Sequence, residues 1–205
     1  MKFSYPILIV VIIVFFSACK NEKKEESPSK QEKEITEAIS KIDPSYQQIG
    51  LNMAFTTKAK LGENLMRVMK EKGAVEALQF CKIKANTITD SMATVHNARI
   101  KRVSDKTRNP NNKPNEIELK NIAYFKNVLS KGEEIAPIIE TINDSIYFYY
   151  PIITNEMCLK CHGTPNKEID QATLLSLKDL YPTDKAVGYS ENQVRGIWSI
   201  QFQKQ

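Results

Sequence analysis

The chain has 205 residues, of which 29 are basic and 24 acidic, and its net charge is +5 at neutral pH. Charges of both signs are interspersed, and no basic stripe carries interleaved aromatic side chains, so the composition excludes nucleic acid as an expected partner. The part from Ile35 onward is long enough for one domain with a hydrophobic core and too short for two.

Residues 1–18 have the pattern of a signal peptide. An apolar run from Ile7 to Phe16 follows a basic residue, and small residues and then Cys19 come after it. The run is shorter than the about 20 apolar residues that a transmembrane helix needs. The four residues that end at Cys19 also resemble the processing box of bacterial lipoproteins. We therefore expect a lipid on Cys19, and the alternative is plain secretion with Cys19 removed.

Residues 19–34 are predicted to be the lipidated cysteine and a tether. The segment from Lys20 to Glu34 is almost wholly charged or polar, so it cannot bury apolar surface. The domain then covers residues 35–205. These segments predict an exported protein that is anchored to the cell envelope through Cys19. The expected place is the outer membrane, facing the periplasm or the surface.

Two long helices are predicted at the start of the domain. Asp43-Pro44 fits an N-cap and a first helical residue, and apolar residues continue at near-helical spacing to Gly73. A second helix is predicted from Ala74 to Arg99. One stripe of this helix contains Leu78, Cys81, Ala85, Ile88, Met92 and Val95. Such a stripe faces a hydrophobic core, so Cys81 is predicted to point inward.

A loop and a short helix are predicted next. Residues 109–115 contain two prolines and four asparagines, which favour turns over a continued helix. A helix is then predicted from Glu116 to about Leu129, with Gly132 as its stop.

Strands are predicted in the last third of the chain. Residues 135–142 and 146–153 are rich in β-branched and aromatic side chains and flank an Asn-Asp turn, which predicts a hairpin. Residues 196–202 predict a closing strand. Helices grouped before antiparallel strands imply an α+β fold whose sheet is covered by helices on one side.

The run from Cys158 to His162, of sequence CLKCH, lies between these strands and is the attachment signature of a c-type haem. Two cysteines at this spacing can each add to a haem vinyl group, and the histidine after them lies under the iron. Because the chain has only four cysteines, chance explains the pattern poorly. We expect one covalent haem c on Cys158 and Cys161, with His162 as an axial ligand.

The sequence pattern alone does not decide which residue is the second axial ligand of the iron. Lipid and thioether bonds account for three cysteines and leave Cys81 unpaired in an oxidising compartment. A lone cysteine on an apolar stripe also fits a small buried hydrophobic residue. Rival ligands by residue type are Met53, Met92, Met157 and His96.

Two arginines are candidates to neutralise the haem propionates. A guanidinium can pair with a carboxylate through two hydrogen bonds, which favours Arg102 and Arg108 for this role. The alternative is that both residues belong to an exposed, charged helix end.

A set of motifs spread along the domain resembles the Tll-like single-haem domain family. The motifs are Ala77-Leu78-x-x-Cys81-x-x-x-Ala85, Arg102-x-Ser104-x-x-x-Arg108-Asn109-Pro110-x-Asn112, Tyr150-Pro151-Ile152, Cys158-Leu159-Lys160-Cys161-His162-Gly163, Tyr181-Pro182-x-Asp184-x-Ala186-x-Gly188-Tyr189 and Arg195-Gly196. The resemblance implies a PAS-like antiparallel sheet with long N-terminal helices. It also implies His and Cys axial ligands, with Cys81 as the second. Asn192-Gln193 stands where a Gly-Asp turn is common, and asparagine tolerates the left-handed backbone of such a turn.

The resemblance is to sensory modules, so we expect a redox sensor or a sensor of carbon monoxide or nitric oxide. Two protein ligands leave no open position on the iron, which disfavours an enzyme such as a peroxidase. No transmitter segment follows Gln205, so the signal is expected to pass to a partner protein. A low-potential periplasmic electron-transfer cytochrome is the alternative. A third possibility is a zinc-binding or thiol–disulfide protein that uses Cys158, Cys161, His162 and Cys81.

Overall fold

A computed structural model describes residues 45–203 of the chain. The predictions for the signal peptide, the lipidated Cys19, the tether and the Asp43-Pro44 helix start lie outside these residues. The described elements, in chain order, are α2 (Ser45–Val95), β1 (Ala98–Val103), the 3₁₀ helix η1 (Pro110–Asn112), α3 (Glu116–Ser130), β2 (Ile138–Ile142), β3 (Ser145–Ile153), α4 (Glu156–His162), α5 (Gln171–Leu180) and β4 (Val194–Phe202). This order is that of an α+β fold, as predicted.

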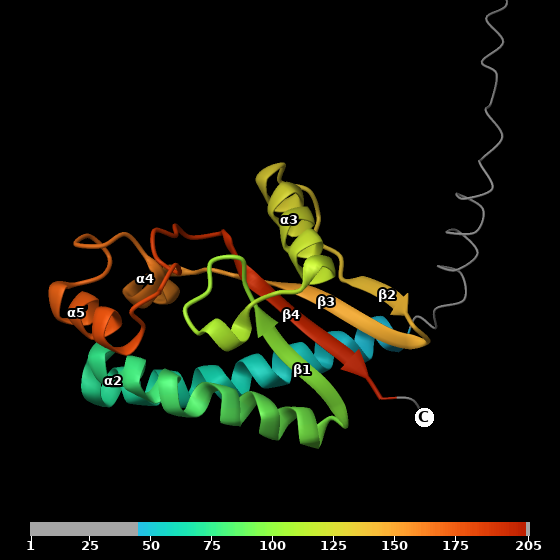
Figure 1. The fold of residues 1–205 in the computed structure, drawn as a ribbon, viewed down its shortest axis with the longest axis horizontal. Coiled ribbons are helices and arrows are strands. Elements are labelled where there is room, and N and C mark those ends of the chain that lie inside the picture. The colour runs from blue at the N-terminus through green and yellow to red at the C-terminus, as the bar shows by residue number, and fades with distance from the viewer. Residues whose placement is uncertain (1–44, 204–205) are drawn as a thin grey trace, which may run out of the picture. The chain divides into compact units, whose positions relative to one another are not determined.

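The long element α2 is a hairpin of two helical halves that meet at Gly73. The backbone of Gly73 has φ 83° and ψ −176°, a conformation that essentially only glycine adopts. In Figure 1 the first half runs toward this point and the second half runs back beside it. His96, just after the second half, lies 2.8 Å from the Thr56 hydroxyl through its Nε2. The break predicted at Gly73 is confirmed.

Four antiparallel strands form one sheet in the order β1-β4-β3-β2. The hairpin of β2 and β3 turns through Asn143 and Asp144, as the sequence predicts, and both residues have positive φ. Strand β4 lies at the centre, between β3 and β1, and pairs with both along most of its length. The irregular register between Ile152 and Ile153 ends the pairing of β3 just before α4 begins.

Helices cover both faces of this sheet, which corrects the expectation of a one-sided arrangement. On one face, Met53 and Ala54 of α2 pack with Phe148 and Ile200. On the other face the helix α3 packs against alternate residues of the same strands, through Ile122, Phe125 and Val128 against Val103, Tyr149 and Ile197. Neighbouring residues of a strand point to opposite faces of the sheet. A strand with apolar residues at successive positions therefore predicts that both faces of the sheet are covered by other elements. Figure 1 shows α2 and α3 on opposite sides of the sheet.

Several elements differ from the prediction. The second helix ends at Val95 rather than Arg99, because Asn97 takes a left-handed conformation with φ 48° and the chain enters β1. Arg102 is therefore a strand residue and not part of a helix end, and Val95 is 71% exposed rather than inward. The strand β1 and the helices α4 and α5 were not predicted, and the N-cap of α5 is Asp170.

The turn at Asn192 is as expected, because this residue has φ 57° and the turn leads directly into β4. Among residues 45–203, no helix combines the length and the apolar composition needed to cross a membrane.

Candidate cofactor-binding site

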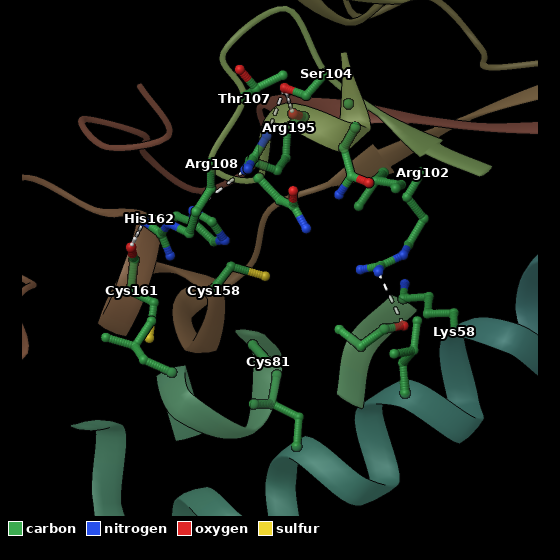
Figure 2. A pocket seen from close by; sticks show the side chains of 18 of the residues that line it. Lys58, Cys81, Arg102, Ser104, Thr107, Arg108, Cys158, Cys161, His162 and Arg195 are labelled. Carbon is green, nitrogen blue, oxygen red and sulfur yellow. Dashed lines mark hydrogen bonds between the residues drawn. The ribbon is translucent and has the colours of Figure 1, made fainter. Parts of the chain in front are cut away.

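A cavity of ≈ 310 Å³ lies between the α2 hairpin, the sheet and α4. This volume falls in the range of small-molecule and cofactor sites. Its walls include Cys81, Cys158, Cys161 and His162, so the structure brings together every sulfur and imidazole that the sequence assigned to a haem. Figure 2 shows these side chains around a common space, with Cys81 on the α2 side.

The short helix α4 fixes the two cysteines and the histidine. Asn155 is its N-cap, and the amide oxygen of this side chain accepts a hydrogen bond of 3.2 Å from the backbone N–H of Cys158. Residues three and four apart on a helix lie on the same side, so Cys158, Cys161 and His162 all face the cavity. Gly163 ends the helix, and a side chain there would meet the carbonyl oxygen of Leu159 and the side chain of Glu168.

The imidazole of His162 is held in one tautomer. Its Nδ1 lies 2.7 Å from the carbonyl oxygen of Ala186 and 3.3 Å from Nε of Arg195. One nitrogen cannot donate to the first and accept from the second, and the shorter contact with a carbonyl requires N–H at Nδ1. Nε2 is then the unprotonated nitrogen that is available to a metal. Burial, Arg108 and Arg195 also hold the pKa of His162 well below its usual value, so the ring is neutral.

Cys81 lies in the second half of α2 and is partly buried at the cavity wall. Burial raises the pKa of the Cys81 thiol, and the charges of Arg102 and Arg108 oppose this shift. The sequence stripe placed Cys81 inward, and the structure agrees. Among the rival ligands, Met157 also lines the cavity. Met53 lies in the sheet core, and neither Met92 nor His96 is part of the cavity wall.

The two predicted arginines have different surroundings. Arg108 is buried and forms an ion pair of 2.9 Å with Asp184. Its Nη2 also donates to the carbonyl oxygens of Cys161 at 2.6 Å and Ala186 at 3.3 Å. Arg108 thus ties the end of α4 to the segment that holds His162. The proposed contact of Arg108 with a propionate stays a prediction.

Arg102 points from β1 toward the second half of α2. Its Nε donates to the Thr89 hydroxyl at 3.2 Å, and its Nη2 donates to the carbonyl oxygen of Ala85 and the amide oxygen of Asn86. Burial and, to a lesser extent, the nearby Arg195 lower the pKa of Arg102. No ion pair compensates its charge within residues 45–203.

The charge on the cavity wall is of one sign. Four basic side chains line it, and no aspartate or glutamate does. They are Lys58, Arg102, Arg108 and Arg195. A wall of this kind suits a ligand that is apolar over most of its surface and carries carboxylates. No signal in the sequence marks Lys58 as a site residue, and Arg195 stands out there only as part of a motif.

Over residues 21–202, the sequence matches the Tll0287-like family. The chain belongs to this family. The structure is also similar to one titled "Crystal structure of the cyanobacterial heme-protein Tll0287". The likeness has a TM-score of 0.59 at 18% sequence identity, and it covers 80% of this chain and 98% of the other. At this identity the likeness shows the fold. No curated protein matches the sequence.

Proposed function

We propose that this member of the Tll0287-like family is a c-type haem protein that carries one haem, bound covalently through Cys158 and Cys161. The observation that carries the proposal is that both thiols and His162 face one cavity from a single helix turn. The remaining wall combines apolar side chains with basic and neutral polar ones and no acidic one, which fits the apolar ring and anionic propionates of haem. The solved structure with the same fold is titled a heme-protein. When bound, a haem supplies one-electron redox chemistry and affinity for diatomic gases.

We further propose that His162 and Cys81 supply the two axial ligands. The hydrogen bond from His162 to Ala186 orients the ring and leaves Nε2 free, as ligating histidines generally require. Cys81 lies on the α2 side of the same cavity. An anionic sulfur ligand stabilises ferric iron, so this pair favours a low reduction potential.

The proposed role is that of a redox or diatomic-gas sensor that signals through a partner protein. Cys81 belongs to the half of α2 that follows the break at Gly73, whereas His162 belongs to α4. Release of Cys81 from iron would therefore free one helix half while the haem stays attached to α4. This separation of the two ligands on different elements supports a switch.

An electron-transfer cytochrome is the second candidate. Cys158 is partly exposed, and the neighbouring Met157 is 36% exposed while both line the cavity. An attached haem would thus have one edge near the surface, where a redox partner protein could approach. A zinc site has less support, because within residues 45–203 no three His, Cys, Asp or Glu side chains are placed to hold a metal ion together.

The experiment that tests the haem proposal is expression of the full chain with export and haem-maturation machinery. We expect colour that survives acid–acetone extraction and denaturing electrophoresis, and its loss when Cys158 and Cys161 are both changed to Ser. Haem that is extractable from the wild-type protein would contradict covalent attachment.

The Cys81→Ala variant tests the ligand and the switch. We expect the low-spin ferric spectrum to change and the midpoint potential to rise, because an anionic donor is lost. A sensor should bind carbon monoxide once reduced and show altered hydrogen exchange in residues 74–95, whereas a carrier should change little between oxidation states. An unaltered spectrum and potential in Cys81→Ala would leave Met157 as the next candidate.

The proposed location is the cell envelope, through a lipid on Cys19 and the charged segment after it. Cys19→Ser should release the protein from membrane fractions. Mass spectrometry of the mature wild-type protein should find Cys19 as its first, acylated residue, and a different first residue would refute the anchor.

A further inference from the structure

We propose that Lys58 and Arg102 form the binding site for a carboxylate of the cofactor, a haem propionate. This inference rests on the proposed function, and it deepens that function by naming the cations that the propionate meets. The two residues come from different elements of the cavity wall, Lys58 from the first half of α2 and Arg102 from β1.

The guanidinium of Arg102 has hydrogen-bond donors that no described residue accepts. Its Nε and Nη2 are fixed by Thr89, Ala85 and Asn86, which orient the guanidinium. Its Nη1 forms no hydrogen bond within residues 45–203. An oriented guanidinium with one free edge is suited to bind a carboxylate.

The charge of Arg102 also lacks a directly paired counterion among residues 45–203, where only the more distant carboxylate of Asp90 acts on it. A guanidinium taken out of water without an opposite charge costs free energy, and buried charges are normally paired. Arg108 obeys this rule through its ion pair with Asp184. Arg102 forms no ion pair among the described residues, and no acidic side chain lines the cavity. An anion supplied by the bound ligand would complete the pairing.

Lys58 adds a second unpaired cation. This exposed side chain lines the cavity and forms neither a hydrogen bond nor an ion pair within residues 45–203. In the view of Figure 2, Lys58 and Arg102 are both drawn on the side away from His162 and Cys161. In haem, the vinyl-derived carbons that bind cysteine and the propionates lie on different edges of the ring. The two cations are thus on the side where a propionate is expected once Cys158 and Cys161 hold the ring.

The first test is the reactivity of the Lys58 amine toward an acylating reagent, followed by mass spectrometry. The wild-type haem protein is compared with the haem-free Cys158→Ser, Cys161→Ser variant. We expect acylation of Lys58 to be several-fold slower with haem than without. Lys84, an exposed lysine of the same element that does not line the cavity, should react at one rate in both. Equal rates at Lys58 in the two forms would overturn the inference.

The second test measures the midpoint potential of the attached haem. Unlike the first test, it does not require that the haem-free protein folds. Loss of a cation near the propionate favours the ferric state. For Arg102→Gln we expect the reduced-to-oxidised ratio at a fixed potential to fall about tenfold, which is about 59 mV for one electron. For the exposed Lys58, screening by solvent reduces the expected change in Lys58→Gln to about threefold. Arg102→Lys and Lys84→Gln should stay close to the wild type.

The outcomes separate the two proposals. A wild-type protein without haem overturns the proposed function, and this site with it. A haem protein whose potential is unchanged in Arg102→Gln and Lys58→Gln overturns the site alone.

Discussion

The position of His162 depends on a short series of contacts that starts at Arg108. Arg108 binds the carboxylate of Asp184, and this carboxylate also accepts a hydrogen bond of 2.8 Å from the backbone N–H of Ala186. The carbonyl oxygen of Ala186 then accepts from Nδ1 of His162. A buried ion pair is costly to break from one side, so these residues hold the imidazole in a single orientation before any cofactor binds. These contacts give Arg108 a structural role that does not depend on a propionate.

Arg195 brings a second cation to the same imidazole. Its Nη1 is anchored by the Ser104 hydroxyl at 2.6 Å and the carbonyl oxygen of Lys106 at 3.1 Å, and its guanidinium lies over the Tyr189 ring. With Nε 3.3 Å from Nδ1 of His162, this charge opposes the gain of positive charge when an attached haem is oxidised.

We predict that Arg195→Gln lowers the midpoint potential of the haem protein, by about 59 mV for each tenfold change in the redox equilibrium. A spectroelectrochemical titration measures this shift. Arg195→Lys keeps the charge and should move the potential much less. A fall of the same size in both variants would point to altered packing around His162 rather than to charge.

Among the elements, the α2 hairpin depends on one backbone conformation. Gly73 has φ 83° and ψ −176° and is exposed, and a Cβ atom at this position would meet nothing within 4 Å. Its role is therefore conformational and not one of packing. An L residue in this region is strained by about 1–3 kcal/mol.

We predict that Gly73→Ala lowers the free energy of unfolding by about 1–3 kcal/mol. Gly62, in the first half of α2, is the matched control, because its surroundings are equally open but its backbone is helical. Alanine at an ordinary helical position stabilises by about 0.5–1 kcal/mol. Urea denaturation should therefore shift in opposite directions for the two variants. Stabilisation by both substitutions would mean that the break at Gly73 is not required.

The elements show what local sequence could predict. The break at Gly73 and the turn at Asn143 and Asp144 depend on residues close together in the chain, and these predictions are confirmed. The cysteine and histidine run from Cys158 to His162 is evident in the sequence, but the helix α4 that carries it was not predicted. The prediction that the second helix continues to Arg99 is wrong, because α2 ends at Val95 and β1 begins at Ala98. The alternation of this strand is short, because only Ala98, Ile100 and Val103 are buried. Pairing with β4, almost a hundred positions away, decides its structure.

At the scale of the whole molecule, the site joins parts of the chain that no sequence motif connects. Lys58 belongs to the first half of α2, Arg102 to β1 and Arg195 to β4, and the fold alone brings them to one cavity. Cys158, Cys161 and His162 could be found from sequence because one helix turn carries all three. The excess of positive charge on the cavity wall could not be found from the sequence. It depends on which acidic residues lie away from the cavity, and only the fold determines that.

The segment between α4 and α5 links the site to the stability of the whole domain in acid. Two carboxylates order it. Glu168 accepts a hydrogen bond of 2.8 Å from the backbone N–H of Thr164, and Asp170 caps α5 by accepting from the backbone N–H of Thr173 at 2.8 Å. The Thr164 hydrogen bond, with help from Lys167, lowers the pKa of Glu168 from 4.5 to about 2. The hydrogen bonds from Thr173 lower the pKa of Asp170 from 3.8.

Both groups bind a proton more weakly in the folded state than in the unfolded state. Their contribution to stability is therefore complete above the ordinary pKa values and is lost as the pH falls through the folded ones. We predict that stability declines between about pH 5 and pH 2, and that the decline is shallower in Glu168→Gln. Relative to the wild type, this variant should be less stable at pH 7 and similar near pH 2, as measured by thermal unfolding. Glu76→Gln, at an exposed site on α2 without a hydrogen bond or ion pair in the described part of the chain, should leave the profile unchanged. A Glu168→Gln profile parallel to the wild type would show that this carboxylate does not govern the acid response.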